Sequence, residues 1–275
     1  MKNYFDLHTH SSESDGILNP EELVSSAKSV GIEYLALTDH DTVSGIQQAK
    51  ISGEALGVNV IPAIELSCTW SGVGIHIVGL HIDVHAKSMV NGVAQQTAAR
   101  AERSEVIAAR LEKKGIEAPL EGAQRHAGGG LVTRPHFAAY LVEKGYVTSI
   151  NSAFRRYLGA GKCGDVKQFW PEMDEVVRWI LQSGGIPVLA HPKRYKMTNA
   201  KRRRLVEVFC DAGGQAIEVI SGSQTADETR YLADLAEHFG LYASAGSDFH
   251  NPEWPWHSLG GFGKLPPQCK MVPLS

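Results

Sequence analysis

The sequence contains few of the features that mark membrane, secreted and disulfide-bonded proteins. No apolar run approaches the roughly 20 residues that cross a bilayer, and the N-terminus lacks the basic, apolar and small-residue order of a signal peptide. Only four cysteines occur in 275 residues, without a CxxC pair, so neither a disulfide framework nor a cysteine zinc site is expected. We therefore expect a cytoplasmic protein with no membrane partner.

The sequence also lacks a strong excess of one charge. Its formal net charge is −3, and no extended stripe of basic and aromatic residues appears, so long nucleic acid is not an expected partner. With 43% apolar residues, the chain can bury a sizeable core. These properties indicate a soluble globular protein.

Short apolar runs alternate with helix patterns along most of the chain. Helix patterns begin at Asn19, which can cap a helix with Pro20 and Glu22, and at Pro171, and others cover about 200–212 and 225–239. The alternation predicts an α/β fold with mostly parallel strands. The expected strands are 4–8, 34–40, 60–67, 75–80, 186–191, 216–221 and 241–250.

This rhythm stops in the middle of the chain. Helix patterns at about 93–114, 134–144 and 148–158 predict a small inserted helical cap subdomain at 86–167, between two barrel segments, 1–85 and 168–275. Residues 100–170 hold 12 Lys and Arg against 7 Asp and Glu, so this part is basic while the rest is acidic. A basic cap offers partners for phosphate, although a solvated basic surface explains most such charges equally well.

Nearly every expected strand finishes in a histidine or an acidic residue. In a parallel α/β barrel the carboxyl ends of the strands converge on one rim, so these side chains would meet there. Zinc takes about four such ligands, and manganese or iron about five or six with water included, so the set suits two or three ions. The candidate metal ligands are His8, His10, Asp15, His40, Glu65, His76, His191, Asp248 and His250.

Other polar residues near the rim receive different interpretations. On an unbroken strand His81, five residues beyond His76, points to the opposite face, so it is not a candidate ligand. Asp39 and Asp41 either orient an imidazole or cap the next helix. Ordinary surface or core roles are expected for His81, His85, His126, His238 and His257.

Five motifs carry a resemblance to a known family: HTHSSESDG (8–16), TDHD (38–41), IELS (64–67), AHP (190–192) and SDFH (247–250). In order and spacing they resemble the PHP domain of polymerases and histidinol phosphatase, within the amidohydrolase-like superfamily. RPHFA in the insertion and HPKRY after the fifth strand resemble the TrpH or RNase AM type. The resemblance implies a distorted seven-stranded β/α barrel that holds two or three divalent ions, with manganese expected and iron or zinc as alternatives.

The resemblance also implies a substrate and the residues that bind it. Arg134, His136, Lys162 and Arg194 would hold phosphates, and a helix start capped by Thr133 favours anions at the first two. For catalysis, Asp248 or a neighbouring ligand would accept the proton, and either His191 or His136 would protonate the leaving oxygen. The lysine loop GAGKCG lacks the first glycine and the hydroxyl residue of a Walker A motif, so ATP hydrolysis is not expected.

The implied activity is removal of the 3′-phosphate from nucleoside 3′,5′-bisphosphates to give nucleoside 5′-monophosphates, with trimming of short RNA from its 5′ end as a further activity. A histidinol-phosphatase-type enzyme would share the barrel and the ions. A non-catalytic, metal-stapled binding module is the alternative of another class. The sequence does not predict an oligomeric state.

Overall fold

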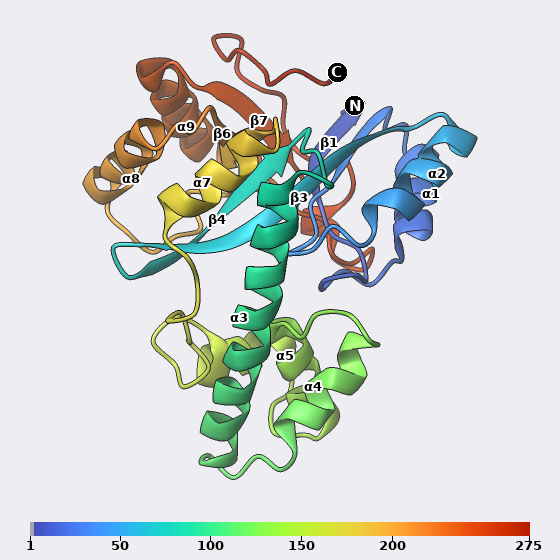
Figure 1. Ribbon diagram of the computed structural model, residues 1–275, viewed down its shortest axis with the longest axis vertical. Coiled ribbons are helices and arrows are strands. Elements are labelled where there is room, and N and C mark those ends of the chain that lie inside the picture. Colours follow the sequence, from blue (N-terminus) through green and yellow to red (C-terminus); the bar gives the residue numbers. More distant parts are fainter. Residues whose placement is uncertain (1–2) are drawn as a thin grey trace. The chain divides into compact units, whose positions relative to one another are not determined.

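A computed structural model describes residues 3–275, and the chain divides into two compact units. The barrel unit extends to Val93 and resumes at Pro171–Ser275, and the helical unit comprises Ala94–Trp170. Helix α3 (Lys87–Glu112), labelled in Figure 1, belongs partly to each. The alternation of strands and helices therefore ends where helix α3 begins, at Lys87. The boundary between the two compact units lies several residues later, after Val93.

The barrel unit is built on one seven-stranded sheet whose strands follow the chain order. Strand β1 also lies beside β7, because the Asp248 N–H donates to the His8 carbonyl at 2.8 Å and Thr9 bridges Phe249. The sheet is thus nearly closed, which confirms the expected distorted seven-stranded α/β barrel. The strands are β1 (Phe5–Thr9), β2 (Tyr34–Leu37), β3 (Asn59–Trp70), β4 (Val73–Leu80), β5 (Ile186–Leu189), β6 (Ala216–Ser221) and β7 (Tyr242–Gly246).

One strand runs against the others. Strand β4 is antiparallel to both β3 and β5, whereas the other neighbouring pairs are parallel. The cause is the two-residue turn Ser71–Gly72, with φ angles of 47° and 73°, because two successive positive φ angles are typical of a tight β-hairpin. The first half of β4 consequently lies at the rim where the parallel strands end.

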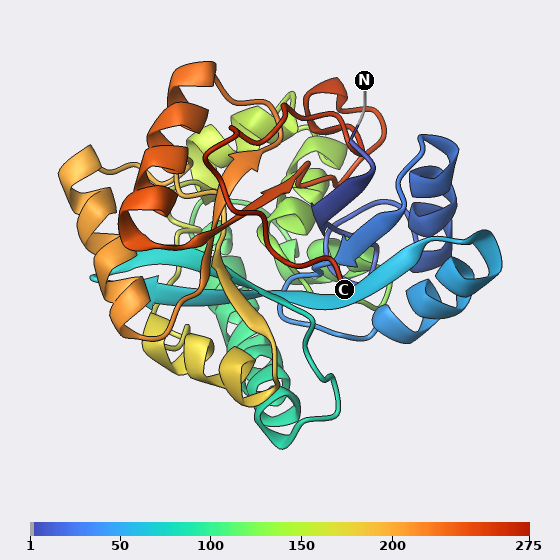
Figure 2. The same cartoon turned by 90° about the horizontal axis from the view of Figure 1, so that it is seen from above.

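Helices cover the outside of the strands, with α1 and α2 to one side and α8 and α9 to the other (Figure 2). Helix α1 (Pro20–Ser29) begins as expected, because the Asn19 side chain accepts the N–H of Glu22 at 2.9 Å. Helix α7 starts two residues later than expected, because the Pro171 carbonyl accepts the N–H of Thr69 on β3. The outer helices are α1, α2 (Ile46–Leu56), α7 (Met173–Gln182), α8 (Asn199–Asp211) and α9 (Ala226–Phe239).

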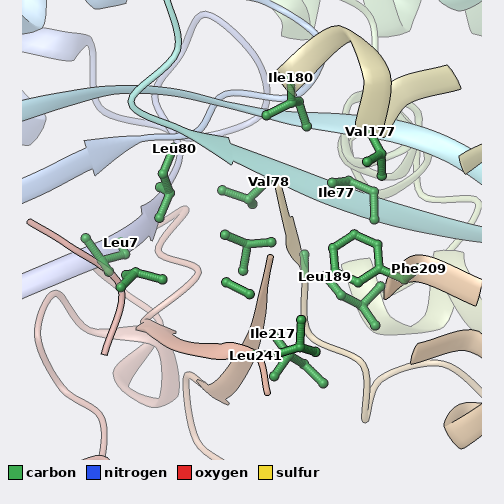
Figure 3. Close-up of a cluster of buried hydrophobic side chains, with 14 of the residues drawn as sticks. Leu7, Ile77, Val78, Leu80, Val177, Ile180, Leu189, Phe209, Ile217 and Leu241 are labelled. Carbon is green, nitrogen blue, oxygen red and sulfur yellow. The ribbon is translucent and has the colours of Figure 1, made fainter. Parts of the chain in front are cut away.

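Apolar side chains fill the space between the sheet and these helices (Figure 3). Val177 and Ile180 of α7 lie against the outer face of β4, which carries Ile77, and the next residue, Val78, points to the opposite face. All four are at most 2% exposed, so water is excluded from beneath the strands that carry the candidate ligands. Among the described residues, no helix is long and apolar enough to cross a membrane.

The helical unit has its own apolar core, formed around Leu111, Phe137 and Leu158. The expected helix at 148–158 is divided into α6 and a π-helical segment, because the Gly159 N–H reaches back five residues to the Phe154 carbonyl. Helix α4 was not expected from the sequence. Besides the second part of α3, the elements are α4 (Pro119–Ala127), α5 (Arg134–Glu143), α6 (Ile150–Ala153) and η1 (Phe154–Leu158).

Candidate metal centre and active site

All nine candidate metal ligands lie in the barrel unit, and the structure brings them together. Their donor atoms form four overlapping groups, and within each group the atoms lie within 4.8 Å of one another. The groups are His10–Asp15–His40–His250, His8–Glu65–His191, His8–His10–Asp248 and His40–Glu65–His76. Shared members make this a single cluster with room for more than one cation.

Glu65 lies at the centre of the cluster. Its Oε1 is 2.9 Å from Nδ1 of His76 and 2.8 Å from Nε2 of His191, and its Oε2 is 3.0 Å from Nδ1 of His40. Since its two oxygens face different imidazoles, this carboxylate can bridge two cations. The side chain is only 1% exposed.

Several donor atoms of the cluster are buried without a hydrogen-bond partner. Such atoms are rare in native proteins, because each has lost water without regaining a partner. Nε2 of His8 and Oε2 of Glu65, for instance, are 3.3 Å apart but not in hydrogen-bond geometry. Divalent cations would satisfy these atoms, so the residues fit the expected metal site. The unpartnered atoms are His8 Nε2, His10 Nδ1 and Nε2, His40 Nδ1, Glu65 Oε2 and His191 Nδ1.

The electrostatics of the cluster keep its carboxylates charged. Burial raises the pKa of Glu65, but His40, His76 and His8 together hold this pKa well below its ordinary value. Burial likewise raises the pKa of Asp15, and the histidines around it hold the net pKa well below the usual range. For His40, burial is the main cause of a pKa well below that of free imidazole. Ionised carboxylates and a neutral imidazole are the forms that bind cations.

Glu218 on β6 orients two of the ligands and was missed in the sequence. Its Oε1 lies 3.0 Å from Nδ1 of His8, and its Oε2 accepts the backbone N–H of His191 at 2.6 Å. A carboxylate on the far nitrogen of a ligand imidazole fixes the ring and its tautomer. The available signal was a glutamate within the apolar strand AIEVIS, every residue of which is buried.

The turn that opens the HTHSSESDG motif is held by Asp39. This carboxylate accepts hydrogen bonds from the N–H and Oγ of Ser11 and from Oγ of Ser14, at 2.6–2.7 Å. Gly16 is required for close approach, because a Cβ there would lie 2.3 Å from the His10 carbonyl oxygen. Helix α2 is capped by Gly45, so the capping alternative for Asp39 is wrong.

Two of the ligands have backbone conformations that non-glycine residues rarely adopt. His191 and Asp248 have φ angles of 29° and 53°, and each follows the end of a strand. Glu218 holds the N–H of His191, and the His8 carbonyl holds that of Asp248. Strain of this kind concentrates at functional sites, where the surrounding structure imposes it.

The structure places the candidate phosphate-binding residues in both units. Arg194, in the barrel unit, forms an ion pair with the ligand Asp248. In the helical unit, Arg134 donates to the Leu158 carbonyl at 3.3 Å, and Nδ1 of His136 accepts the Thr133 N–H at 3.1 Å.

Lys162, also in the helical unit, is exposed and lines a cavity of about 570 Å³. Arg155 and Arg156 line the same cavity, so three positively charged side chains surround it. None of the three lies within salt-bridge distance of a carboxylate in residues 3–275. The sequence did not single out the two arginines, although adjacent basic residues near Lys162 were a visible signal.

Histidines that were not expected to bind metal have other partners. His126 contacts Glu143 at 2.8 Å, and Nδ1 of His257 lies 2.7 Å from the Ser247 carbonyl. His81 contacts the Pro273 carbonyl, but the expected reason was incomplete. It follows the end of the antiparallel strand β4, so it lies at the end of the barrel opposite His76, whatever its face.

The fold and the site together define an α/β-barrel enzyme with one cluster of candidate metal ligands. The chain belongs to the PHP domain family, whose model matches residues 6–182. This confirms the family resemblance seen in the five motifs.

Similar proteins agree with this assignment. The chain is 46% identical over 258 residues to "5'-3' exoribonuclease Rnm" of Escherichia coli, covering 93% of this chain and 88% of that protein. It is 39% identical over 268 residues to "3',5'-nucleoside bisphosphate phosphatase" of Chromobacterium violaceum, covering 97% and 94%. An amidohydrolase structure from Chromobacterium violaceum, with bound sulfate and no metal, superposes with a TM-score of 0.91 at 39% identity, covering 98% and 94%. The expectation of a phosphoester-hydrolysing enzyme is therefore confirmed.

Proposed function

We propose that this enzyme removes the 3′-phosphate of nucleoside 3′,5′-bisphosphates and also shortens RNA oligonucleotides from the 5′ end. The cluster around Glu65 carries the proposal, because its four donor groups suit several cations and phosphate esters are hydrolysed at such centres. The names of the relatives in Escherichia coli and Chromobacterium violaceum give the two substrate types.

We propose that the nine cluster residues hold two or three divalent cations, with manganese preferred and iron or zinc as alternatives. Imidazole with carboxylate suits all three metals, and the absence of cysteine from the cluster removes the ligand that would favour zinc. When bound, such cations stabilise charge on a phosphoryl group and make water a stronger nucleophile near neutral pH.

The protein's own residues would supply proton transfer and positioning. Asp248 is the proposed proton acceptor, and Arg194, which pairs with it, would hold its carboxylate and a phosphate oxygen. For the leaving oxygen we favour His136 over His191. His191 lies 2.8 Å from Glu65 within a ligand group, whereas the Thr133 N–H bonds Nδ1 of His136 and so leaves the proton of the neutral ring on Nε2.

We further propose that Arg134 and Lys162 bind substrate phosphate. A substrate with two phosphates needs one group of contacts at the reacting phosphate and another at the anchoring phosphate. The concentration of basic residues in 100–170 supports this division of roles. The three basic side chains around the cavity, Arg155, Arg156 and Lys162, would together attract a phosphate to it.

A phosphate-release screen of the metal-replete enzyme tests the proposal. Adenosine 3′,5′-bisphosphate should yield adenosine 5′-monophosphate and phosphate, and a 5′-phosphorylated oligoribonucleotide should yield mononucleotides. Histidinol phosphate should be turned over at least tenfold less efficiently. Preference for histidinol phosphate would instead assign the small-molecule phosphatase alternative, and a protein that binds metal but hydrolyses none of the three would be a metal-stapled binding module.

A further inference from the structure

The loop that follows the metal ligand His250 carries two tryptophans with parallel rings. The centroids of Trp254 and Trp256 are 6.5 Å apart, and their planes differ by only 12°. Trp254 is in turn 6.3 Å from the imidazole of His250. All of these residues belong to the barrel unit, so their arrangement relative to the metal centre is fixed within one compact body.

The aromatic series runs from the buried metal centre to the surface. His250 stacks on His10 with centroids 4.1 Å apart and planes 22° apart. His10 is fully buried, whereas Trp256 is 52% exposed. Of the five tryptophans, all of which lie in the described chain, Trp256 is the one that is exposed. Trp256 therefore presents an aromatic face to solvent at the end of a series of rings that begins in the candidate metal cluster.

Hydrogen bonds hold the loop in place. The Oγ of Ser223 donates to the Trp256 carbonyl at 2.9 Å, and the Trp254 N–H donates to the Asn251 carbonyl at 3.1 Å. The ring of His257, the next residue, is bonded to the Ser247 carbonyl at 2.7 Å. Because these partners come from the ends of β6 and β7 and from the loop itself, the backbone that carries the two indoles is held in place before any ligand arrives.

We propose that Trp254 and Trp256 form a stacking surface for the nucleobase of the substrate. This inference rests on the proposed function and adds a base-recognition element to it. With the reacting phosphate at the cluster that includes His250, the base is separated from that phosphate by one ribose, and the first aromatic surface beyond His250 is Trp254. Stacking on aromatic faces is tolerant of base identity, which suits the proposed shortening of RNA, where any of the four bases can occupy the site.

The test compares two substrates that differ only in the base. Adenosine 3′,5′-bisphosphate carries the base, and ribose 3,5-bisphosphate has the same phosphates without it. Loss of one stacking contact lowers affinity by about 5- to 150-fold. Trp256→Ala should therefore lower kcat/KM for the nucleotide by about that factor and leave kcat/KM for the ribose compound unchanged. Trp256→Phe should retain most of the activity, because it keeps an aromatic face.

The controls separate this proposal from the proposed function. Ile51→Ala removes an exposed apolar side chain on α2, 62% exposed, and should change neither substrate. Adenosine 5′-monophosphate should quench the tryptophan fluorescence of the metal-replete wild type, with much weaker quenching in Trp256→Ala. If the wild type hydrolyses neither substrate, the proposed function fails and the quenching alone decides about stacking. Equal losses on both substrates, no loss on either, or quenching unaffected by Trp256→Ala would overturn the stacking proposal.

Discussion

Replacement of Glu65 by glutamine tests whether its carboxylate bridges two of the proposed cations. Glu65 belongs to two of the four donor groups, together with His8 and His191 in one and His40 and His76 in the other. Glutamine keeps the shape but removes the charge and one acceptor oxygen. We expect the wild type to bind at least two divalent ions per chain, and the variant to lose at least one, because His10–Asp15–His40–His250 does not need Glu65.

The expected magnitude follows from linkage between metal binding and folding. One ion present at about 100 times its dissociation constant stabilises the folded state by about 2.7 kcal/mol, so two independent ions contribute about 5 kcal/mol. For a chain of this size that corresponds to a chelation-induced fall in Tm of roughly 10–20 °C. In Glu65→Gln the fall should be about half as large, and hydrolysis should be lost by at least about 1000-fold because the remaining ion lacks its neighbour.

Elemental analysis of metal-replete protein measures the number of ions per chain. Thermal unfolding with and without a chelator measures the fall in Tm. Glu54→Gln is the matched control, since it makes the same chemical change at an exposed position of α2. A Glu65→Gln protein that keeps the wild-type ion count and the wild-type chelation shift would refute the bridging role. A wild type that binds one ion or none would refute the multinuclear centre itself.

Three further predictions concern residues around the cluster and in the helical unit. Glu218→Gln should lower metal affinity or kcat by about 10- to 100-fold, because Glu218 orients candidate metal ligands and does not itself bind metal. Activity measured during a titration with manganese gives both quantities. Lys162→Ala should reduce kcat/KM for adenosine 3′,5′-bisphosphate by about 10- to 150-fold but spare p-nitrophenyl phosphate, and equal losses would contradict an anchoring role. Asp6→Asn should lower the free energy of unfolding by about 1–3 kcal/mol in urea titrations, because the amide cannot accept from both the Ser247 and the Gly260 N–H groups; an unchanged value would contradict this.

The gathering of the candidate metal ligands was predictable because most of them lie on a recognisable apolar strand or follow one closely. The carboxyl end of a short parallel strand lies at a defined rim, so His8 near the end of β1, and His191 and Asp248 just after β5 and β7, could be placed there without coordinates. The helix at Pro20 was equally predictable, because its capping residues are local in sequence. The apolar strand pattern and the capping pattern can both be recognised from residues that are neighbours along the chain.

Features that depend on contacts distant in sequence were not predictable. Glu218 looks like any residue of a buried strand until His8, 210 positions away, is seen to face it. The pairing of Trp254 with Trp256 could not be predicted, because the parallel arrangement of their rings depends on a loop held by Ser223. The roles of Arg134 and Lys162 remain predictions for the same reason, since sequence gives their charge and not their partner.

The reversed strand explains why Glu65 is central although it does not end a strand. Strand β3 pairs with β2 only as far as Leu37 and Pro62, apart from the isolated bridge between His40 and Glu65, and then continues to Trp70 as one arm of the hairpin with β4. Residues of this hairpin beyond β2 therefore line the rim on both arms. A parallel β4 would have needed a crossover connection and would have placed His76 far from the rim. The tight turn at Ser71–Gly72 thus sets the position of the candidate ligand His76 relative to Glu65.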